Sequence, residues 1–381
     1  MPQGIYDADH EAFRSSVRGF LARLVWPRAE QFVQDKCIPR DIWLAAGAQG
    51  YLGLEVPEQY GGSAAGDYRF NAVLIEELAK VNMALASSLS IHFDVVAPYL
   101  VHRTTEEQRQ RWLPGLATGE TLTAIGMTEP SAGSDLASLR TSAERRGAGW
   151  VLNGSKTFIT NGYSADLIIV AVRTTPGSRS RGITLFGVEG SMPGFRRGRK
   201  LDKVGQPEAD TAELFFDDVF VPDDNLIGNL NCGFAHMMDG LPQERLGAAV
   251  ANLAHARQIL DETITYAKNR RAFDTPIGSF QHNKFILADL VTQAEVTQAY
   301  IDQCVLAQSH GELRAVDAAK AKLWSSQVQN GILDHCLQLY GGYGYMNEQR
   351  VARAWKDARV TKIWAGSNEI MQELIGRDLG L

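Results

Sequence analysis

Cysteine is scarce in this sequence, and its few occurrences form no pattern. The chain has 381 residues and eight scattered histidines, and no His-Glu-x-x-His segment occurs. Its four cysteines, none in Cys-x-x-Cys spacing, are Cys37, Cys232, Cys304 and Cys336. These absences argue against a disulfide framework, a zinc site and metal catalysis. We expect reduced core thiols in a cytoplasmic protein with no bound metal.

The sequence also lacks an excess of basic residues. Its net charge is −6, and acidic residues lie among the basic ones. Nucleic-acid and membrane-surface partners call for a basic patch or tail, so neither is expected. Residues 1–10 lack the basic and apolar parts of a signal peptide, and no uninterrupted apolar run is long enough to span a bilayer.

Three familiar motifs are absent or incomplete. Gly149–Thr157 nearly spells a P-loop, but Ser155 separates the glycine from the lysine and a strand rather than a helix follows. Gly341–Tyr345 is glycine-rich but follows a helical pattern, whereas a dinucleotide fingerprint follows a strand. No Gly-x-Ser-x-Gly elbow is present, so hydrolase chemistry has no nucleophile signal.

The hydrophobic pattern changes twice along the chain. Helical periodicity predicts helices over 11–32, 68–81 and 105–116. Short strands bounded by Gly, Pro, Asn and Asp are then predicted over 150–152, 167–172, 183–188 and 211–216. Afterwards a long helix with Leu246 to Ile264 on its buried face is predicted, followed by helices over 283–309, 315–340 and 347–360.

This order of helices, strands and helices contains no βαβ alternation, which argues against a Rossmann fold. It predicts an α+β protein with a helical N-terminal domain (residues 1–122), an antiparallel β middle domain (123–231) and a helical bundle as the C-terminal domain (232–381). The length of the chain is sufficient for two or three domains of this kind.

Two segments of the middle region carry the most information. They are Met127-Thr-Glu-Pro-Ser-Ala-Gly-Ser-Asp135 and Phe158-Ile-Thr-Asn-Gly162. Small hydroxyl residues and glycines let a backbone approach a flat ring closely and offer donors to its edge. Either segment alone is also a good turn sequence. Together, and with the matches below, they resemble the flavin-facing loops of the acyl-CoA dehydrogenase family.

The resemblance extends from the loop 56–62 to Leu379 and implies FAD as cofactor. Thr128 and Thr160 would bond the polar edge of the flavin, and Ser134 would lie where flavin and CoA meet. Arg270 would pair with the FAD pyrophosphate from a neighbouring subunit. The implied cofactor residues are Met127, Thr128, Ser134, Phe158, Ile159, Thr160, Arg270, Phe273, Gln281, Gln338, Leu339, Gly341, Gly342, Ser367 and Glu369.

Some of these matches have ordinary explanations when taken singly. Taken alone, Arg270 is more typical of a surface arginine at a helix end. Gln338 could be an exposed helix residue, and Ser367 could be only a helix N-cap. Asp274 replaces the glycine of the family's Arg-x-x-Phe-Gly element, which leaves the geometry of that loop open. The order of all the elements together favours the cofactor interpretation.

The catalytic base is implied at an unusual position. Many family members place a glutamate immediately before Gly-Thr near the C-terminus, but Ala365 stands there and cannot accept a proton. The long-chain and isovaleryl-CoA branch instead has Leu-x-x-Glu-Arg on a long helix, and Leu241–Arg245 matches it, so Glu244 is the implied base. Pro242 suits a first helical turn, so we expect Glu244 near a helix N-terminus.

Ala365 is implied to contribute only its backbone N–H, which the family uses to polarise the thioester carbonyl. Arg245 is equally compatible with a direct substrate contact and a structural role. The implied substrate residues are Ser134, Leu241, Arg245 and Gly366.

The implied function is FAD-dependent oxidation of an acyl-CoA to trans-2-enoyl-CoA, as in fatty acid β-oxidation, by a homotetramer or dimer that passes electrons to an electron-transferring flavoprotein. Three alternatives stay open: a flavin oxidase or monooxygenase on the same fold, a dehydrogenase of an acyl group on a carrier protein, and a flavin scaffold that has lost catalysis. Glu244 argues against the last of these. The acyl chain length is left undetermined.

Overall fold

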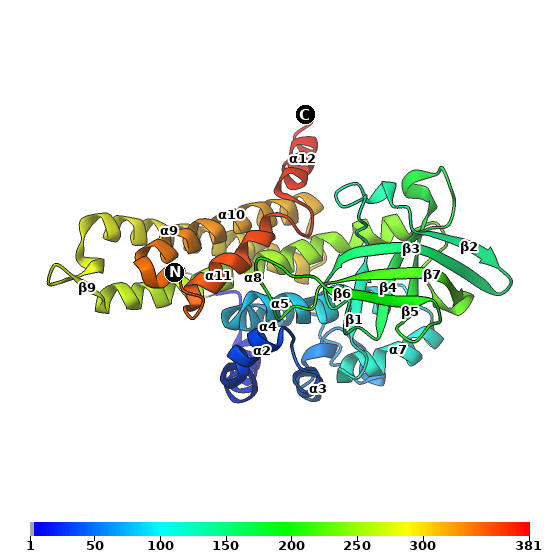
Figure 1. Ribbon diagram of the computed structural model, residues 1–381, viewed down its shortest axis with the longest axis horizontal. Coiled ribbons are helices and arrows are strands. Elements are labelled where there is room, and N and C mark those ends of the chain that lie inside the picture. Colours follow the sequence, from blue (N-terminus) through cyan, green and yellow to red (C-terminus); the bar gives the residue numbers. More distant parts are fainter. Residues whose placement is uncertain (1–3) are drawn as a thin grey trace.

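The computed structural model describes residues 4–381. Helices come first in the chain, a β-sheet unit follows, and a second set of helices forms a bundle (Figure 1). The sheet unit lies at one end of the elongated molecule and the free end of the bundle at the other, with the N-terminal helices below the middle in this view. The fold class predicted from the sequence is confirmed.

The N-terminal part is helical, but its first helix is shorter than predicted. Instead of one helix over 11–32, α1 covers Ala8–Phe20, a π-helical turn covers Leu21–Val25 and α2 covers Ala29–Asp35. Pro27 interrupts this stretch because it lacks the N–H that a continuous helix would need. The following helices are α3 (Arg40–Ala48), α4 (Arg69–Val81), α5 (Met83–Ser90), α6 (Ala97–His102) and α7 (Glu106–Thr118).

One helical stretch has the length and composition of a membrane span, although polar residues interrupt its apolar run. It is Met83–His102, which consists of α5, a π-helical turn over Ile91–Val96 and α6, and its hydropathy is 1.4. In the structure, 78% of an 18-residue apolar segment of this stretch is buried. Buried core helices also meet these criteria, and α5 packs against α4 and against α8 (Gly233–Asn269), so we interpret the stretch as a core helix.

The sheet unit has the strand order β6-β7-β3-β2-β4-β5-β8, with β1 beside β4. Neighbouring strands are antiparallel, except that β1 and β2 pair with β4 in parallel. The four predicted strands correspond to β3, β4, β5 and β7; the others are short or, like β6, highly basic. The strands are β1 (Thr123–Gly126), β2 (Ser142–Arg146), β3 (Gly149–Ile159), β4 (Leu167–Arg173), β5 (Ile183–Glu189), β6 (Phe195–Lys200), β7 (Ala212–Pro222) and β8 (Leu226–Ile227).

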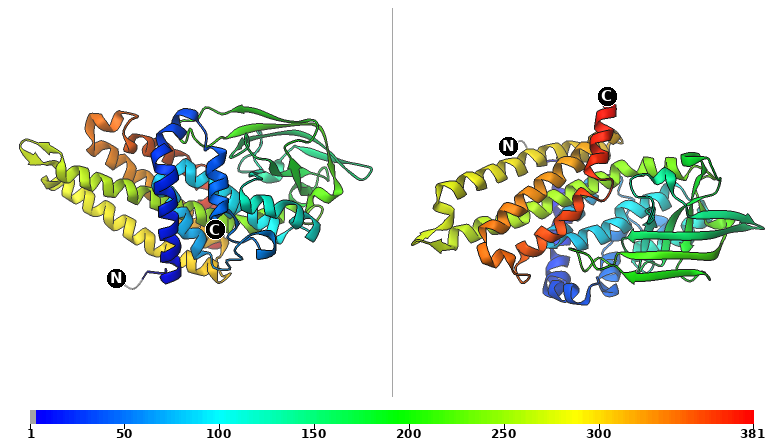
Figure 2. Two further views of the ribbon diagram at one scale, coloured as in Figure 1. Left: turned by 90° about the horizontal axis from the view of Figure 1, so that it is seen from below. Right: turned by 45° about the horizontal axis from the view of Figure 1, so that its top comes forward.

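The C-terminal part is organised around α8, which runs from the sheet unit to the far end of the bundle (Figures 1 and 2). A short hairpin of β9 (Arg271–Ala272) and β10 (Thr275–Pro276) then reverses the chain. Helix α12 projects from the side of the bundle. The helices are α8 (Gly233–Asn269), α9 (Gln281–Ser309), α10 (Ala315–Leu339), α11 (Arg350–Ala358) and α12 (Asn368–Asp378).

A single hydrophobic core joins the N-terminal helices to the bundle. It contains side chains from both parts, among them Phe20, Leu74, Leu246 and Ile332. Helix α8 packs against α4, α9 and α10, so it is the common support of both parts. Residues early in α8 therefore lie beside the sheet unit, and residues at its end lie at the far tip of the bundle.

Candidate active site

Two loops of the sheet unit lie side by side, as their motifs predict. The Thr157 N–H donates a hydrogen bond to the Thr128 carbonyl oxygen over 3.0 Å. This contact holds the segment 127–135 next to the segment 158–162. Both loops stand at the ends of strands, β1 and β3, that are anchored in the sheet.

The two hydrophobic residues of the second loop face different environments. The backbone of Phe158 has a φ of 60°, which turns the chain, and 68% of the residue is exposed. Ile159 has its side chain in the core of the sheet unit. Of these two predicted cofactor residues, Ile159 could therefore contribute only its backbone, whereas the Phe158 ring is free to cover a ligand.

A buried ion pair connects these loops, and the sequence analysis missed it. The Nζ of Lys156 lies 2.8 Å from Oε1 of Glu129 and donates to the Met127 carbonyl over 3.2 Å. Glu129 also accepts the N–H groups of Arg140 and Thr141. Burial lowers the pKa of Lys156 to about 8, although the charge of Glu129 opposes this shift. The local sequence gave no signal of this burial, because Lys156 stands between Ser155 and Thr157.

Glu244 lies in the body of α8 and not near its start. The helix begins at Gly233, and Pro242 stands inside it. The expectation of a helix N-terminus at Pro242 was therefore wrong, because the helix already starts where the chain leaves the sheet unit. The helix dipole acts mainly on the first turn, so it does not account for the proton affinity of Glu244.

The surroundings of Glu244 instead raise its pKa by burial. Its Oε1 accepts a hydrogen bond from the Tyr99 hydroxyl over 3.3 Å. Burial raises the pKa of Glu244 to about 7, while the Tyr99 hydrogen bond and the charge of Arg245 act in the opposite direction and the charge of Asp94 adds to the rise. A carboxyl group that titrates near neutral pH is well suited to general base catalysis.

Arg245 joins this helix to the loop before α12. The residue is buried, and its Nε donates to the Ala365 carbonyl oxygen over 3.4 Å. Ala365 and Gly366 have φ angles of 52° and 87°, so the loop turns sharply at the point of contact. The Ala365 N–H has no hydrogen-bond partner among residues 4–381 and is free to donate to a ligand. The structure thus brings together Glu244, Arg245, Ala365 and Gly366.

Lys322 is a second buried cation that the sequence analysis missed. From α10 its Nζ donates to the Gly366 carbonyl over 2.7 Å and to Oδ1 of Asn368 over 3.1 Å. Burial is the main cause that lowers the pKa of Lys322 to about 8. The signal was weak: the neighbours of Lys322 one turn earlier, Ala318 and Ala319, are apolar, but those one turn later are serines.

Three further predicted residues lie on the two helices next to this loop, α12 and α8. Ser367 is the N-cap of α12 and its hydroxyl accepts the Ile370 N–H over 3.5 Å, so the N-cap interpretation describes its contact within the chain. Glu369 is exposed in the first turn of α12. Leu241 is buried on α8, one turn before Glu244.

A second group of predicted residues meets at the far end of the bundle. A hollow of about 490 Å³ lies there, and the stacked rings of Tyr266 and Tyr340, 4.1 Å apart, form part of its wall. The Arg270 guanidinium lies 5.8 Å from the centre of the Tyr343 ring. The lining residues are Arg270, Gln338, Leu339, Gly341 and Gly342 of the predicted set, with Tyr266, Ile277, Tyr340, Tyr343 and Met346.

The predicted cofactor residues therefore form two groups rather than one. About 38 Å of helix, at 1.5 Å per residue, separates Glu244 from the end of α8 next to Arg270. Gln281, at the start of α9, and the exposed Phe273 belong to the far group. Within one chain the far group cannot contact a ligand held by the loops of the sheet unit.

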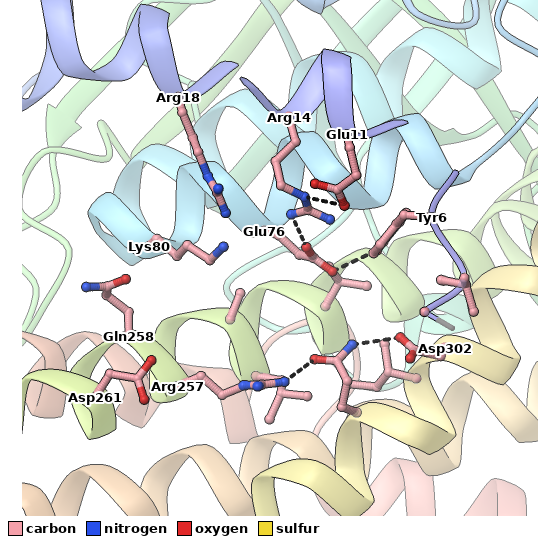
Figure 3. A pocket seen from close by; sticks show the side chains of 17 residues that line it. Tyr6, Glu11, Arg14, Arg18, Glu76, Lys80, Arg257, Gln258, Asp261 and Asp302 are labelled. Atoms are coloured by element: carbon pink, nitrogen blue, oxygen red, sulfur yellow. Dashed lines mark hydrogen bonds and ion pairs between the residues drawn. The ribbon is translucent and has the colours of Figure 1, made fainter. Parts of the chain in front are cut away.

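Another hollow, of about 400 Å³, lies between the N-terminal helices and the bundle (Figure 3). Many of its charges are paired with one another: Arg14 binds Glu11 and Glu76. On the opposite wall Arg257 binds Gln298, which in turn donates to Asp302. None of the predicted catalytic or cofactor residues lines it. We therefore place the candidate site at Glu244 and the loops around it.

Comparisons with known proteins agree with this arrangement. Three family models match the chain: the N-terminal domain of acyl-CoA dehydrogenase over residues 7–120, the middle domain over 124–219 and the C-terminal domain over 231–380. The mitochondrial long-chain specific acyl-CoA dehydrogenase of Mus musculus is 43% identical over 377 residues, which cover 98% of this chain and 87% of that protein.

Two further relatives are similar over most of their length. The mitochondrial isovaleryl-CoA dehydrogenase of Solanum tuberosum is 34% identical, with 98% of this chain and 91% of that protein covered. The crystal structure of acyl-CoA dehydrogenase from Geobacillus kaustophilus superposes with a TM-score of 0.97 at 42% identity and covers 99% of both chains. Members of this family are FAD-binding oxidoreductases that act on CH–CH bonds. The chain belongs to the acyl-CoA dehydrogenase family.

Proposed function

We propose that this protein uses FAD to oxidise an acyl-CoA thioester between its α- and β-carbons, and that Glu244 is the base that removes the α-proton. The observation that carries this proposal is the pairing of a carboxyl group whose pKa is raised to about 7 with a nearby loop that offers a free N–H at Ala365. These are a base and a donor for the carbonyl oxygen, the two groups that abstraction of a weakly acidic α-proton requires.

The residues present fit FAD. Thr128 and Thr160 carry hydroxyl groups on adjoining loops, and the buried indole N–H of Trp364, next to Ala365, has no partner among residues 4–381. At the far end of the bundle, the Arg270 cation suits a pyrophosphate. When bound, FAD would supply the acceptor for the hydride that leaves the β-carbon.

The side chains around Glu244 would each have one task. Glu244, ionised above about pH 7, would take the proton, and Tyr99 would hold the carboxylate in place until substrate binds. Arg245 would keep the Ala365 loop against the helix, and Lys322 would fix the Gly366 carbonyl from the other side. The Ala365 N–H would then polarise the thioester carbonyl. This assigns Arg245 a structural role close to the substrate.

A second copy of the chain would complete the site. The two groups of predicted FAD contacts lie at opposite ends of α8, so Arg270 of one subunit would serve FAD held by the loops of another. The far end of the bundle also exposes large apolar side chains, including Phe273 (93%) and Tyr345 (83%). Exposed apolar clusters of this kind are typical of subunit interfaces. We therefore propose a homodimer or homotetramer.

The proposed electron acceptor is an electron-transferring flavoprotein, and the proposed substrates are acyl-CoAs of the long-chain type. The likeness to the long-chain enzyme supports the substrate class. A flavin oxidase on the same fold would instead reduce oxygen. Substrate-reduced protein should therefore react slowly with oxygen and quickly with an electron-transferring flavoprotein, and rapid peroxide formation at each turnover would assign the protein to the oxidases.

Anaerobic titration tests the proposed reaction directly. Purified protein should be yellow with one FAD per chain, and its flavin absorbance should bleach on addition of saturated acyl-CoAs. A series from short to long straight chains, together with branched ones, would define the substrate, and acyl groups on a carrier protein would test that alternative. Protein that contains FAD but keeps its absorbance with every thioester would contradict the proposal.

A further inference from the structure

A second carboxyl group, that of Asp94, is buried behind the turns of α8 that carry Glu244. Asp94 belongs to the π-helical turn Ile91–Val96 and is only 1% exposed. Its carboxylate accepts hydrogen bonds from Nδ2 of Asn71 (2.9 Å), Nε2 of Gln243 (3.2 Å) and the Tyr68 hydroxyl (3.3 Å). π-helical turns inside longer helices often occur at functional sites.

All the donors to Asp94 are neutral. Two other buried carboxylates, Glu129 and Glu77, are paired with Lys156 and with arginines, whereas Asp357 and Glu208 share with Asp94 a burial with neutral donors only. Burial of a carboxylate without a cation is costly, and burial raises the pKa of Asp94 to about 7. An asparagine would meet most of the same hydrogen bonds without that cost, and Asp94 differs from Asp357 and Glu208 in its contact with the helix of Glu244.

Two glycines on α8 bring Asp94 and Glu244 close to the same stretch of helix. A Cβ at Gly247, one turn after Glu244, would meet Oδ2 of Asp94 at 2.4 Å. A Cβ at Gly240, one turn before Glu244, would meet the Tyr99 hydroxyl at 2.7 Å and the Glu244 carboxylate at 3.3 Å. Gln243, which precedes Glu244, also donates to the Asp94 main-chain oxygen over 3.0 Å.

We propose that Asp94 is a positioning residue that acts through Glu244: the two carboxyl groups form a coupled pair, and the charge of Asp94 makes Glu244 a stronger base. This inference rests on the proposed role of Glu244. Two like charges in a buried region resist simultaneous ionisation, so each makes the other hold a proton more strongly. An ionised Asp94 therefore makes Glu244 a stronger base for the weakly acidic α-proton.

Other charged and titratable groups face the pair from the surrounding elements. Tyr68, the N-cap of α4, and Glu55, in the segment before it, influence Asp94; Tyr99 on α6 and Arg245 on α8 influence Glu244. Glu55 is itself paired with His102 near the surface. Arg245 is the one cation among these groups next to Glu244, and its charge opposes the effect of Asp94. Replacement of Asp94 should therefore leave that opposing effect in place.

The test is the pH dependence of flavin reduction by acyl-CoA, followed anaerobically in the FAD-loaded oligomer. Asp94→Asn should move the apparent pKa for the base down by about one unit, which is the interaction at which two groups begin to titrate as a coupled pair. It should also lower the plateau rate of flavin reduction, because the base is weaker. Tyr68→Phe removes one donor from the Asp94 carboxylate and should produce a smaller shift in the same direction. Asp302→Asn, the same change in the hollow of Figure 3, should leave the profile unchanged.

The outcomes separate this inference from the base assignment. If Glu244→Gln abolishes flavin reduction but Asp94→Asn and Tyr68→Phe keep the wild-type pH profile, the coupling is contradicted while Glu244 remains the base. If flavin reduction in the Glu244→Gln variant is as fast as in the wild type, the base assignment is contradicted, and the coupling proposal that rests on it is contradicted as well. Should Asp94→Asn not fold, the Tyr68→Phe profile decides the question alone.

Discussion

The Nε of Arg245 lies 3.4 Å from the carbonyl oxygen of Ala365 and joins the helix of Glu244 to the loop before α12. This contact holds Ala365, which cannot supply a carboxylate, beside the part of α8 that carries Glu244, which can. The left-handed backbone of Ala365 leaves its N–H unpaired among the described residues. Base and carbonyl donor thus come from different elements that one buried arginine keeps together.

The first prediction concerns Arg270. Arg270→Ala should weaken FAD binding, because a charged hydrogen bond contributes about 1.5–3 kcal/mol, which corresponds to roughly a 10- to 150-fold higher Kd. Its neighbour Arg271, whose guanidinium contacts the Asp274 carbonyl within the same hairpin, provides the matched control. FAD release measured by fluorescence should increase for the Arg270 variant and not for Arg271→Ala. Equal FAD affinity of both variants would remove Arg270 from the cofactor site.

The second prediction concerns the buried pair beneath the flavin loops. Lys156→Met leaves Glu129 charged and without a cation, which should lower the free energy of unfolding by about 3–5 kcal/mol. The double variant Lys156→Met with Glu129→Gln removes both charges and should recover part of that loss. Urea unfolding at constant FAD concentration measures the difference.

A surface pair serves as the control for this prediction. Arg145 and Asp223 form an exposed pair on the same sheet unit, and Arg145→Met should cost less than about 1 kcal/mol. A Lys156 variant as stable as the Arg145 variant would show that the buried pair does not hold the loops.

The third prediction concerns the pH dependence of stability. Burial raises the pKa of Asp357 from its usual 3.8 to about 7, and the nearby Glu208 adds to this effect. Between about pH 4 and 7 the folded protein therefore binds more protons than the unfolded chain, so the free energy of unfolding falls as the pH rises through this interval. Asp357→Asn should make that fall smaller, as measured by urea unfolding at pH 5 and pH 8.

The fall should become smaller without disappearing, because Asp94 and Glu244 also have pKa values raised to about 7 by burial. Asp261→Asn, an exposed position on α8, should retain the full wild-type decline. Identical declines in the Asp357 variant and the wild type would contradict the assigned shift.

The sequence was sufficient to predict the fold class and the family because these depend on extended patterns. Helical and strand periodicities identified the order of the elements, and the segments at 127–135 and 158–162 identified the family. The start of α8 could not be located, because Pro242 resembles a first-turn proline and nothing local shows that the helix already runs from Gly233. Met83–His102 is not an uninterrupted apolar run, yet its mean hydropathy is that of a membrane span, and only its burial shows that it is a core helix.

The residues that support the site were harder to find because their partners are distant in sequence. Lys322 donates to a carbonyl 44 positions away, and Asp94 accepts from a glutamine 149 positions away. No local pattern identifies such a partner. For Lys322 the two alanines one turn earlier were the available signal, and it indicates burial of the residue without identifying its contact.

The reactivity of Glu244→Gln tests the central claim most directly. Glutamine keeps the shape and much of the hydrogen bonding of glutamate but cannot accept the α-proton. FAD content and acyl-CoA binding should stay near normal, while the rate of flavin reduction in anaerobic stopped-flow should fall at least 10²- to 10⁴-fold, roughly the contribution of general base catalysis. The double variant Glu244→Gln with Ala365→Glu should recover part of the rate. Near-normal flavin reduction by the single Glu244→Gln variant would contradict the account.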